Sequence, residues 1–247
     1  MPGEPGWGRL DTHDNALNTV RLALACAVVV GHSWNVGYGI NPPLVPDLAA
    51  YAVDAFFVLS GFLIAGSRVR LRFWRFLWQR SLRIFPGLWA VLLATAFAFA
   101  PFGAWLTGTP VSLADGASYV ARNAALQMGQ PGIGSMLAKV AVPGQWNGSL
   151  WTLSYEFACY MGLTVLFSLF RAKVAAVLAV VTAAAALTAV WPSAMNIYVV
   201  SQSVRFAGFF AAGALIFLVR KHVACSGRAA AMSRSGFSGG SELTRRR

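Results

Sequence analysis

The uncharged stretch 22–46 reads LALACAVVVGHSWNVGYGINPPLVP, without a single Asp, Glu, Lys or Arg. Two further stretches, 84–114 and 174–204, are equally free of these residues. A helix needs about 20 mostly apolar residues to cross the hydrocarbon core of a bilayer. The runs therefore predict an all-α, polytopic integral membrane helical bundle. We expect about six spans, at 17–36, 50–67, 83–103, 149–170, 173–191 and 198–219.

The composition supports a membrane protein and argues against a soluble enzyme. Of the 247 residues, 57% are hydrophobic and only 11% are charged, whereas soluble domains carry about 25% charged residues. The first sixteen residues include Glu4, Asp11 and Asp14, which predicts a polar N-terminus and not a secretory signal peptide. The three cysteines are far apart in the chain, so neither a disulfide framework nor a metal site is expected.

The distribution of positive charge predicts the topology. The net charge is +12, and the connection between the second and third predicted spans is rich in arginine. Its arginines are Arg68, Arg70, Arg72, Arg75, Arg80 and Arg83. The positive-inside rule places this connection, and with an even number of spans both termini, on the cytoplasmic side. The expected organisation is a polar N-terminus (1–16), a membrane domain (17–220) and a disordered basic tail (221–247). The Gly- and Pro-rich external loop 104–148 is expected to be irregular.

Taken alone, the arginine cluster and its aromatic neighbours have the composition of a nucleic-acid surface. Between two spans, the same residues are first a topology determinant and an interfacial belt. Anion binding at the cytoplasmic face is the alternative role. We therefore expect the lipid bilayer, and no nucleic acid, as a partner.

Ionisable residues inside apolar spans are expensive and suggest function. Arg21 and His32 are eleven residues apart, so they project from nearly the same helix face at about 16 Å along the axis. A cytoplasmic Arg and a deeper His would then share one groove. The alternative is an interfacial anchor for Arg21 and a packing role for His32.

Two acidic residues could join His32 at a similar depth. Asp54 begins the second predicted span, and Glu156 is about two turns into the fourth. A carboxylate beside a histidine holds its tautomer and raises its basicity, as proton abstraction from a hydroxyl requires. Hydrogen bonding between helices is the alternative. Arg205 could neutralise a carboxylate or snorkel, and Ser60 suits close helix packing better than nucleophilic catalysis.

Four segments in order carry a family resemblance. They are Arg21–His32 (Arg, ten residues, His), Asp54–Leu63 (DAFFVLSGFL), Arg80–Pro86 (RSLRIFP) and Trp151–Tyr160 (WTLSYEFACY). These segments resemble the acyltransferase 3 family of integral membrane acyltransferases, which modify sugars and other hydroxyl-bearing acceptors. The likeness covers about residues 15 to 170. The family usually has about ten spans, so the resemblance implies a short or truncated member.

The resemblance implies transfer of an acyl group, expected to be acetyl, from an acyl-CoA donor. The acceptor would be a hydroxyl of an envelope saccharide, a glycolipid or an exported small molecule. His32 would be the catalytic base, and Arg21 would assist donor binding or stabilise the site. Arg80 and Arg83 would contact the CoA phosphates, and Glu156 would be an essential polar partner. No metal is implied, and a multi-pass protein of the plasma (inner) membrane is expected.

Two other functions remain open from the sequence. A proton-coupled transporter or export subunit could use the same histidine and carboxylates as a proton relay. An inactive, truncated family member would insert into the membrane without binding a CoA analogue. Acyl-CoA-dependent modification, as opposed to proton-coupled flux, distinguishes an enzyme from a transporter.

Overall fold

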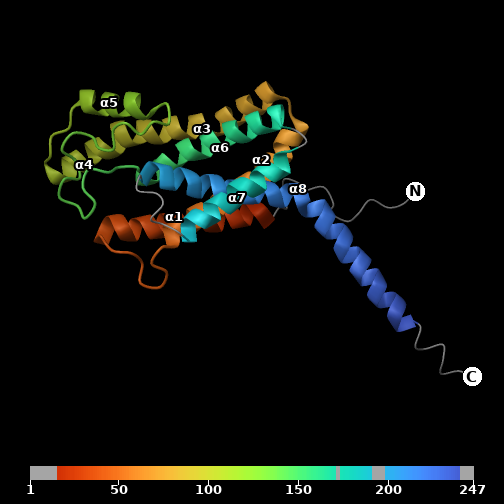
Figure 1. Cartoon of the computed structure of the whole chain (residues 1–247). Coiled ribbons are helices and arrows are strands. Elements are labelled where there is room, and N and C mark those ends of the chain that lie inside the picture. The colour runs from red at the N-terminus through yellow and green to blue at the C-terminus, as the bar shows by residue number, and fades with distance from the viewer. Residues whose placement is uncertain (1–15, 171–172, 191–197, 240–247) are drawn as a thin grey trace, which may run out of the picture. The chain divides into compact units, whose positions relative to one another are not determined.

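The computed structural model describes residues 16–170, 173–190 and 198–239. Its α-helices are α1 (Ala16–Tyr38), α2 (Leu48–Arg70), α3 (Phe73–Ala94), α4 (Ala100–Thr107), α5 (Leu113–Asn123), α6 (Trp151–Leu169), α7 (Val174–Val190) and α8 (Tyr198–Gly239) (Figure 1). A π-helical turn, η1 (Thr95–Phe99), joins α3 to α4, and a 3-10 turn, η2 (Gly148–Leu150), precedes α6. The described residues contain no strand, which confirms the all-α prediction.

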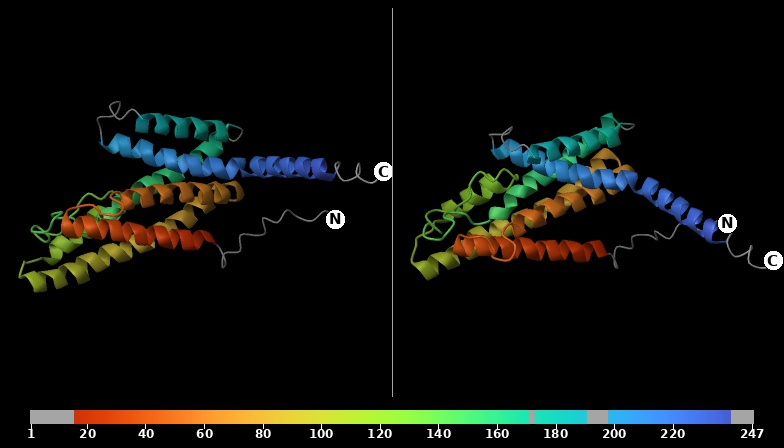
Figure 2. Two further views of the ribbon diagram at one scale, coloured as in Figure 1. Left: turned by 90° about the horizontal axis from the view of Figure 1, so that it is seen from below. Right: turned by 60° about the horizontal axis from the view of Figure 1, so that its bottom comes forward.

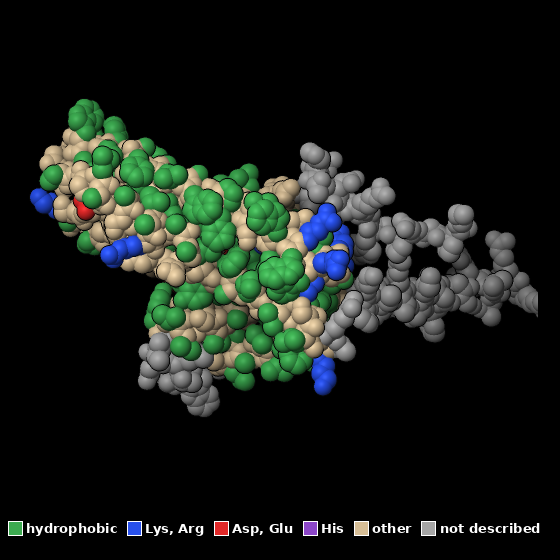
Figure 3. Space-filling view, turned by 90° about the horizontal axis from the view of Figure 1, so that it is seen from above, with side chains coloured by type: hydrophobic (Ala, Val, Ile, Leu, Met, Phe, Trp, Pro, Cys, Tyr) green, Lys and Arg blue, Asp and Glu red, His purple; other side chains and the backbone are tan. Residues whose placement is uncertain are grey.

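Within the described residues, five helical segments are long and apolar enough to cross a membrane: Ala16–Tyr38, Leu48–Arg70, Phe73–Thr107, Gly148–Leu169 and Tyr198–Arg220. Large hydrophobic side chains are exposed along them, and Figure 3 shows hydrophobic side chains distributed over much of one face. In water this exposure would be costly, whereas lipid solvates it. The prediction of a polytopic membrane bundle is therefore confirmed. The remaining predicted span, 173–191, is the shorter apolar helix α7, with 17 residues.

The third span begins earlier than predicted and changes the setting of the arginines. Helix α3 starts at Phe73, ten residues before the predicted boundary at 83, so α2 and α3 are joined only by Leu71 and Arg72. Arg80 and Arg83 consequently belong to a helix, not to a loop. Arginine is a good helix former with a long, snorkelling side chain, so a helix can continue past the edge of the apolar run. The uncharged stretch therefore indicated the part of the helix that lies in the membrane, but it did not indicate the residue at which α3 begins.

At the other end of the chain, α8 continues to Gly239, beyond the predicted start of the tail at 221. The segment 240–247 and most of the predicted N-terminal segment 1–16 lie outside the described residues. The division into three regions therefore stays a prediction.

The chain divides into two compact units, which are described separately. The first consists of residues up to Phe57 together with Phe73–Gly162, and the second of Val58–Arg72 together with the residues from Leu163 onward. The residues to which the sequence assigns a place in the site lie in the first unit: Arg21, His32, Asp54, Arg80, Arg83 and Glu156. Its core includes Phe57, Phe76, Leu88, Leu92 and Tyr119.

In the second unit, small residues allow two backbones to touch. Helix α7 packs along α8 (Figure 2), and the C-terminal half of α2 packs on α8 through glycines. A Cβ on Gly61 would collide with the carbonyl oxygen of Phe210, and a Cβ on Gly213 would collide with that of Val58. Ser60, beside this contact, is buried. The packing role expected for the Ser-Gly pair therefore agrees with the structure.

The segment 108–148 is more ordered than the expected irregular loop. Helix α5 has a capping box, in which Ser112 Oγ accepts from the Asp115 N–H at 3.0 Å and the Asp115 carboxylate accepts from the Ser112 N–H at 3.2 Å. This helix packs on η1, since a Cβ on Gly116 would lie 3.2 Å from the Ala96 carbonyl oxygen. The Gly and Pro content indicated turns correctly, but the capping box and the helix between the turns were missed.

A buried polar network closes this segment over the π-helical turn. The Asn147 amide donates to Thr95 Oγ1 of η1 at 2.9 Å and to Tyr119 Oη of α5 at 2.8 Å. Burial raises the pKa of the Tyr119 phenol, and the hydrogen bond from Asn147 partly opposes the shift. The Tyr119 hydroxyl therefore stays protonated at neutral pH. The three side chains join η1, α5 and the residues before α6.

We expect Asn123→Ala to loosen the turn that follows α5. The Asn123 side chain is fully buried, donates to the Gln130 carbonyl oxygen at 2.7 Å and accepts from the Gln130 N–H at 3.1 Å. Its loss leaves two backbone groups without these partners, at about 1–3 kcal/mol each. Amide hydrogen exchange of residues 124–130 in the purified protein should accelerate at least tenfold. Arg122→Ala, a neighbouring exposed position, is the control, and equal exchange rates in the two variants would contradict the expectation.

Candidate active site

Five polar side chains of the first unit form an electrostatic cluster across three helices. Arg21 of α1 interacts with Arg83 of α3 and with Glu156 and Tyr160 of α6. Arg80 of α3 interacts with the same two residues of α6 and with both other arginines. The four motif-bearing segments thus supply neighbouring side chains in three of the four cases. We call these five residues the arginine–glutamate cluster.

Helical spacing explains how each helix presents its members. Arg80 and Arg83 are three residues apart on α3, and Glu156 and Tyr160 are four apart on α6, so each pair lies on one helix face. The Tyr160 hydroxyl donates a hydrogen bond to Glu156 Oε1. The Arg80 guanidinium carbon lies 5.5 Å from the ring centroid of Phe76, one turn earlier on the same helix. On each of these two helices, a residue one turn away therefore contacts a charged group of the cluster: Phe76 contacts Arg80 on α3, and Tyr160 contacts Glu156 on α6.

The charge balance of the cluster favours anions. The cluster contains three guanidinium groups and one carboxylate, which leaves an excess of two positive charges when all four groups are ionised. Guanidinium groups bind phosphate oxygens through paired, charge-assisted hydrogen bonds. Arg83 is exposed, whereas Arg21 and Arg80 are half-buried, so the cluster is open to a ligand at Arg83.

His32 lies on α1, the helix that also carries Arg21, and is half-buried. It follows Gly31, whose Cβ position would lie 2.8 Å from Ala49 Cβ, so α1 and α2 are in close contact beside the histidine. Asp54 is buried on α2, five residues beyond Ala49, or about 7.5 Å along the helix. Among the described residues, His32 makes no hydrogen bond or ion pair. The predicted convergence of His32, Asp54 and Glu156 stays a prediction.

Arg205, the remaining ionisable residue predicted inside a span, belongs to α8 in the second unit. Its guanidinium carbon lies 6.0 Å from the ring centroid of Phe206. Among the described residues, no three His, Cys, Asp or Glu side chains lie together as metal ligands would.

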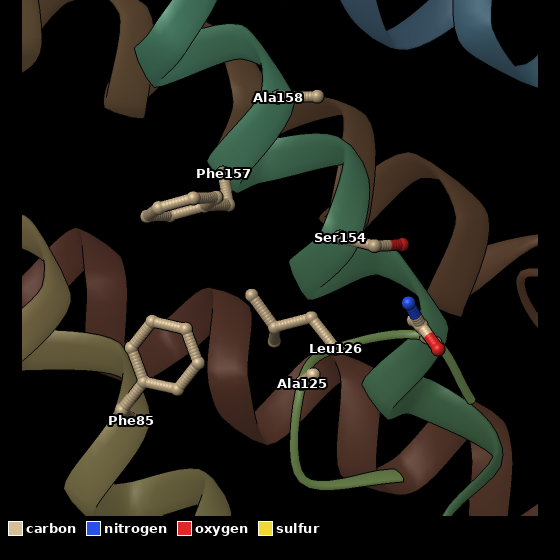
Figure 4. Close-up of a pocket in the computed structure, with 7 residues that line it drawn as sticks. Phe85, Ala125, Leu126, Ser154, Phe157 and Ala158 are labelled. Carbon is tan, nitrogen blue, oxygen red and sulfur yellow. The ribbon is translucent and has the colours of Figure 1, made fainter. Parts of the chain in front are cut away.

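An open pocket of about 370 Å³ lies elsewhere in the first unit, between α3, α6 and the turn after α5. Its lining residues are Phe85, Ala125, Leu126, Gln127, Ser154, Phe157 and Ala158. Figure 4 shows the rings of Phe85 and Phe157 and the side chain of Leu126 directed toward one space. The Trp89 indole N–H donates to the Ala124 carbonyl oxygen at 3.0 Å. This bond fastens the turn to α3.

The pocket and the arginine–glutamate cluster differ in what they can bind. No charged side chain lines the pocket, so it suits a neutral, largely apolar group and offers no counter-charge to a phosphate. Ser154 and Phe157, three residues apart, face the pocket, whereas Glu156 and Tyr160 belong to another face of α6. The cluster is therefore the better site for an anionic substrate.

Tyr160 lies within one of the quoted segments, but no role was predicted for it. The available signal was its spacing of four residues from Glu156 in a helical segment. The Thr95–Tyr119–Asn147 network was missed entirely, because its members are 24 or more residues apart in the sequence and no local pattern links them.

This chain resembles known proteins over more than half of its length. The family model described as an acyltransferase domain, that of acyltransferase 3, matches residues 14–237. Nodulation protein 10 of Rhizobium leguminosarum bv. viciae is 32% identical over 170 residues, which is 64% of this chain and 46% of that protein. The O-acetyl transferase of Shigella phage Sf6 is 31% identical over 151 residues, 60% of this chain and 44% of that protein. The matched segments thus span a little under half of each relative. No solved structure matches.

Proposed function

This chain belongs to the acyltransferase 3 family, and from that premise we propose that it is a multi-pass O-acyltransferase of the plasma membrane. The proposed donor is an acyl-CoA, with acetyl as the acyl group. The proposed acceptor is a hydroxyl of an envelope saccharide, a glycolipid or an exported small molecule. The name of the phage relative, O-acetyl transferase, supports acetyl transfer to oxygen.

The observation that carries the donor assignment is the excess of positive charge in the arginine–glutamate cluster. CoA carries phosphate groups at one end of the molecule and the thioester at the other. Arg80 and Arg83 would bind the phosphates, and Arg21 would add a third guanidinium from α1. The neutral lining of the pocket beside Phe85 makes it unsuitable for this part of the donor.

His32 is the proposed general base. It lies on the same helix as Arg21, about 16 Å further along the axis, which is comparable with the reach of the pantetheine arm. The imidazole would take the proton of the acceptor hydroxyl while the oxygen attacks the thioester carbonyl. The C–S bond then breaks, an ester C–O bond forms, and the CoA thiolate leaves and is protonated. Asp54, buried on the helix that touches α1 at Gly31, is the proposed partner that supports the basicity of His32.

Binding of acetyl-CoA to the purified protein in detergent tests the donor site. Replacing both Arg80 and Arg83 with alanine should weaken binding at least 100-fold. Hydrogen bonds to charged groups contribute about 1.5–3 kcal/mol each, and about 1.4 kcal/mol is tenfold in affinity. Isothermal titration calorimetry gives the dissociation constants.

Arg75→Ala is the matched control, because Arg75 is an exposed arginine of the same helix and is not among the interacting partners of the cluster. It should change the dissociation constant less than twofold. If Arg75→Ala and the double variant lost the same amount of affinity for acetyl-CoA, the effect would be nonspecific electrostatic attraction and not binding by Arg80 and Arg83. A folded wild-type protein that does not bind acetyl-CoA would refute the donor assignment and favour a transporter or export subunit.

A further inference from the structure

The buried tyrosine of the arginine–glutamate cluster has a structural position that the proposed mechanism leaves unused. Tyr160 is only 3% exposed, and its hydroxyl donates to Glu156 Oε1 one turn earlier on α6. A phenol hydroxyl removed from solvent needs a hydrogen-bond partner, and a bond to an ionised carboxylate is among the stronger kinds. The pair therefore restricts how the Glu156 carboxylate can turn.

The orientation of this carboxylate affects more than α6. Glu156 interacts electrostatically with Arg21 of α1 and with Arg80 of α3. These two arginines therefore share Glu156 as an acidic partner. A carboxylate held in one rotamer can balance both guanidinium groups. A carboxylate free to rotate could pair closely with either arginine and withdraw it from a ligand.

We propose that Tyr160 is a positioning residue of the donor site. Its hydroxyl holds the Glu156 carboxylate in the orientation that keeps Arg21 and Arg80 available to the phosphates of an acyl-CoA. The inference rests on the proposed function, since it assigns Tyr160 a part in binding that donor. Tyr160 acts through Glu156 and does not itself touch the donor.

This mechanism differs in its consequences from a purely structural hydrogen bond. An interaction between two exposed residues four apart on a helix stabilises that helix alone. The Glu156–Tyr160 pair is instead linked to arginines of two other helices. Its loss should therefore appear in ligand affinity, and it should appear only while a carboxylate is present at position 156.

A double-mutant cycle on the full chain provides the test. Coenzyme A binding is measured by titration calorimetry for the wild type, Tyr160→Phe, Glu156→Gln and the double variant. We expect Tyr160→Phe to weaken binding about tenfold in the wild-type background. In the Glu156→Gln background, the same change should alter the dissociation constant less than twofold. Melting temperatures recorded on the same samples separate affinity from stability.

Tyr155→Phe is the matched control, because it removes another tyrosine hydroxyl from the same helix, one residue before Glu156. It should leave the affinity for coenzyme A unchanged. Equal weakening by Tyr160→Phe in both backgrounds, or a lower melting temperature with unchanged affinity, would overturn the positioning role. If the wild type binds coenzyme A in an Arg80- and Arg83-dependent manner but Tyr160→Phe binds equally well, this inference fails while the proposed function stands. If the wild type does not bind coenzyme A, the donor assignment fails first, and this inference fails with it.

Discussion

His32→Ala should abolish acyl transfer while the protein still inserts and folds. A general base contributes about 10²–10⁴-fold to a rate, and alanine cannot accept the proton of the acceptor hydroxyl. Because His32 is half-buried and makes no hydrogen bond or ion pair among the described residues, its truncation should cost little stability. We therefore expect at least a 100-fold loss of transfer, measured as acyl-CoA-dependent esterification in membranes, with unchanged affinity for acetyl-CoA.

Ser33→Ala is the control for His32→Ala, since Ser33 is the next residue of α1 and is exposed. It should retain nearly full activity. The pH dependence adds a second criterion, because a base must be deprotonated to act. The rate of acyl transfer by the wild type should increase with pH while one group loses its proton, and it should be constant at higher pH. Transfer by His32→Ala at more than a tenth of the wild-type rate would exclude His32 as the base.

Replacement of Gly61 or Gly213 by leucine should prevent the second unit from folding. A Cβ at either position would overlap a backbone carbonyl oxygen of the opposing helix, that of Phe210 or Val58. Backbone cannot move aside as the end of a flexible side chain can, so α2 and α8 would have to separate. The expected result is loss of the monodisperse peak in detergent size-exclusion chromatography. Overpacking alone commonly costs about 1–3 kcal/mol, and separating two helices should cost more.

Alanine variants show whether a side chain at each glycine raises or lowers the stability of the protein. In a helix interior, Gly→Ala normally stabilises by up to about 1 kcal/mol. Gly162→Ala should follow that rule, because nothing lies within 4 Å of its Cβ position. Gly61→Ala should instead lower the melting temperature, since even one methyl group does not fit. A Gly61→Ala protein as stable as Gly162→Ala would show that α2 and α8 are not in contact at this glycine.

The sequence identified the type of protein because the bilayer imposes a simple rule. Long uncharged runs indicate spans whatever the packing around them, and the structure confirms five long apolar helices where spans were predicted. Helix ends were less predictable. Helix α3 starts at Phe73 because a helix that contains arginines can continue beyond the hydrocarbon core. Likewise, the capping box of Ser112 and Asp115 is a local sequence pattern, but the Gly and Pro residues around it led to the prediction of an irregular loop.

The candidate site was predictable as a set of residues but not as an arrangement. Arg21 and Glu156 were selected because charges are rare in apolar spans, whereas Arg80 and Arg83 were selected because they match an arginine motif of the acyltransferase 3 family. The partnership of Glu156 with Tyr160, and of both with arginines of α1 and α3, depends on how three helices pack. Hydrophobic spacing specifies which face of a helix is apolar. It does not specify which helix that face meets, and that choice was made only by the tertiary structure.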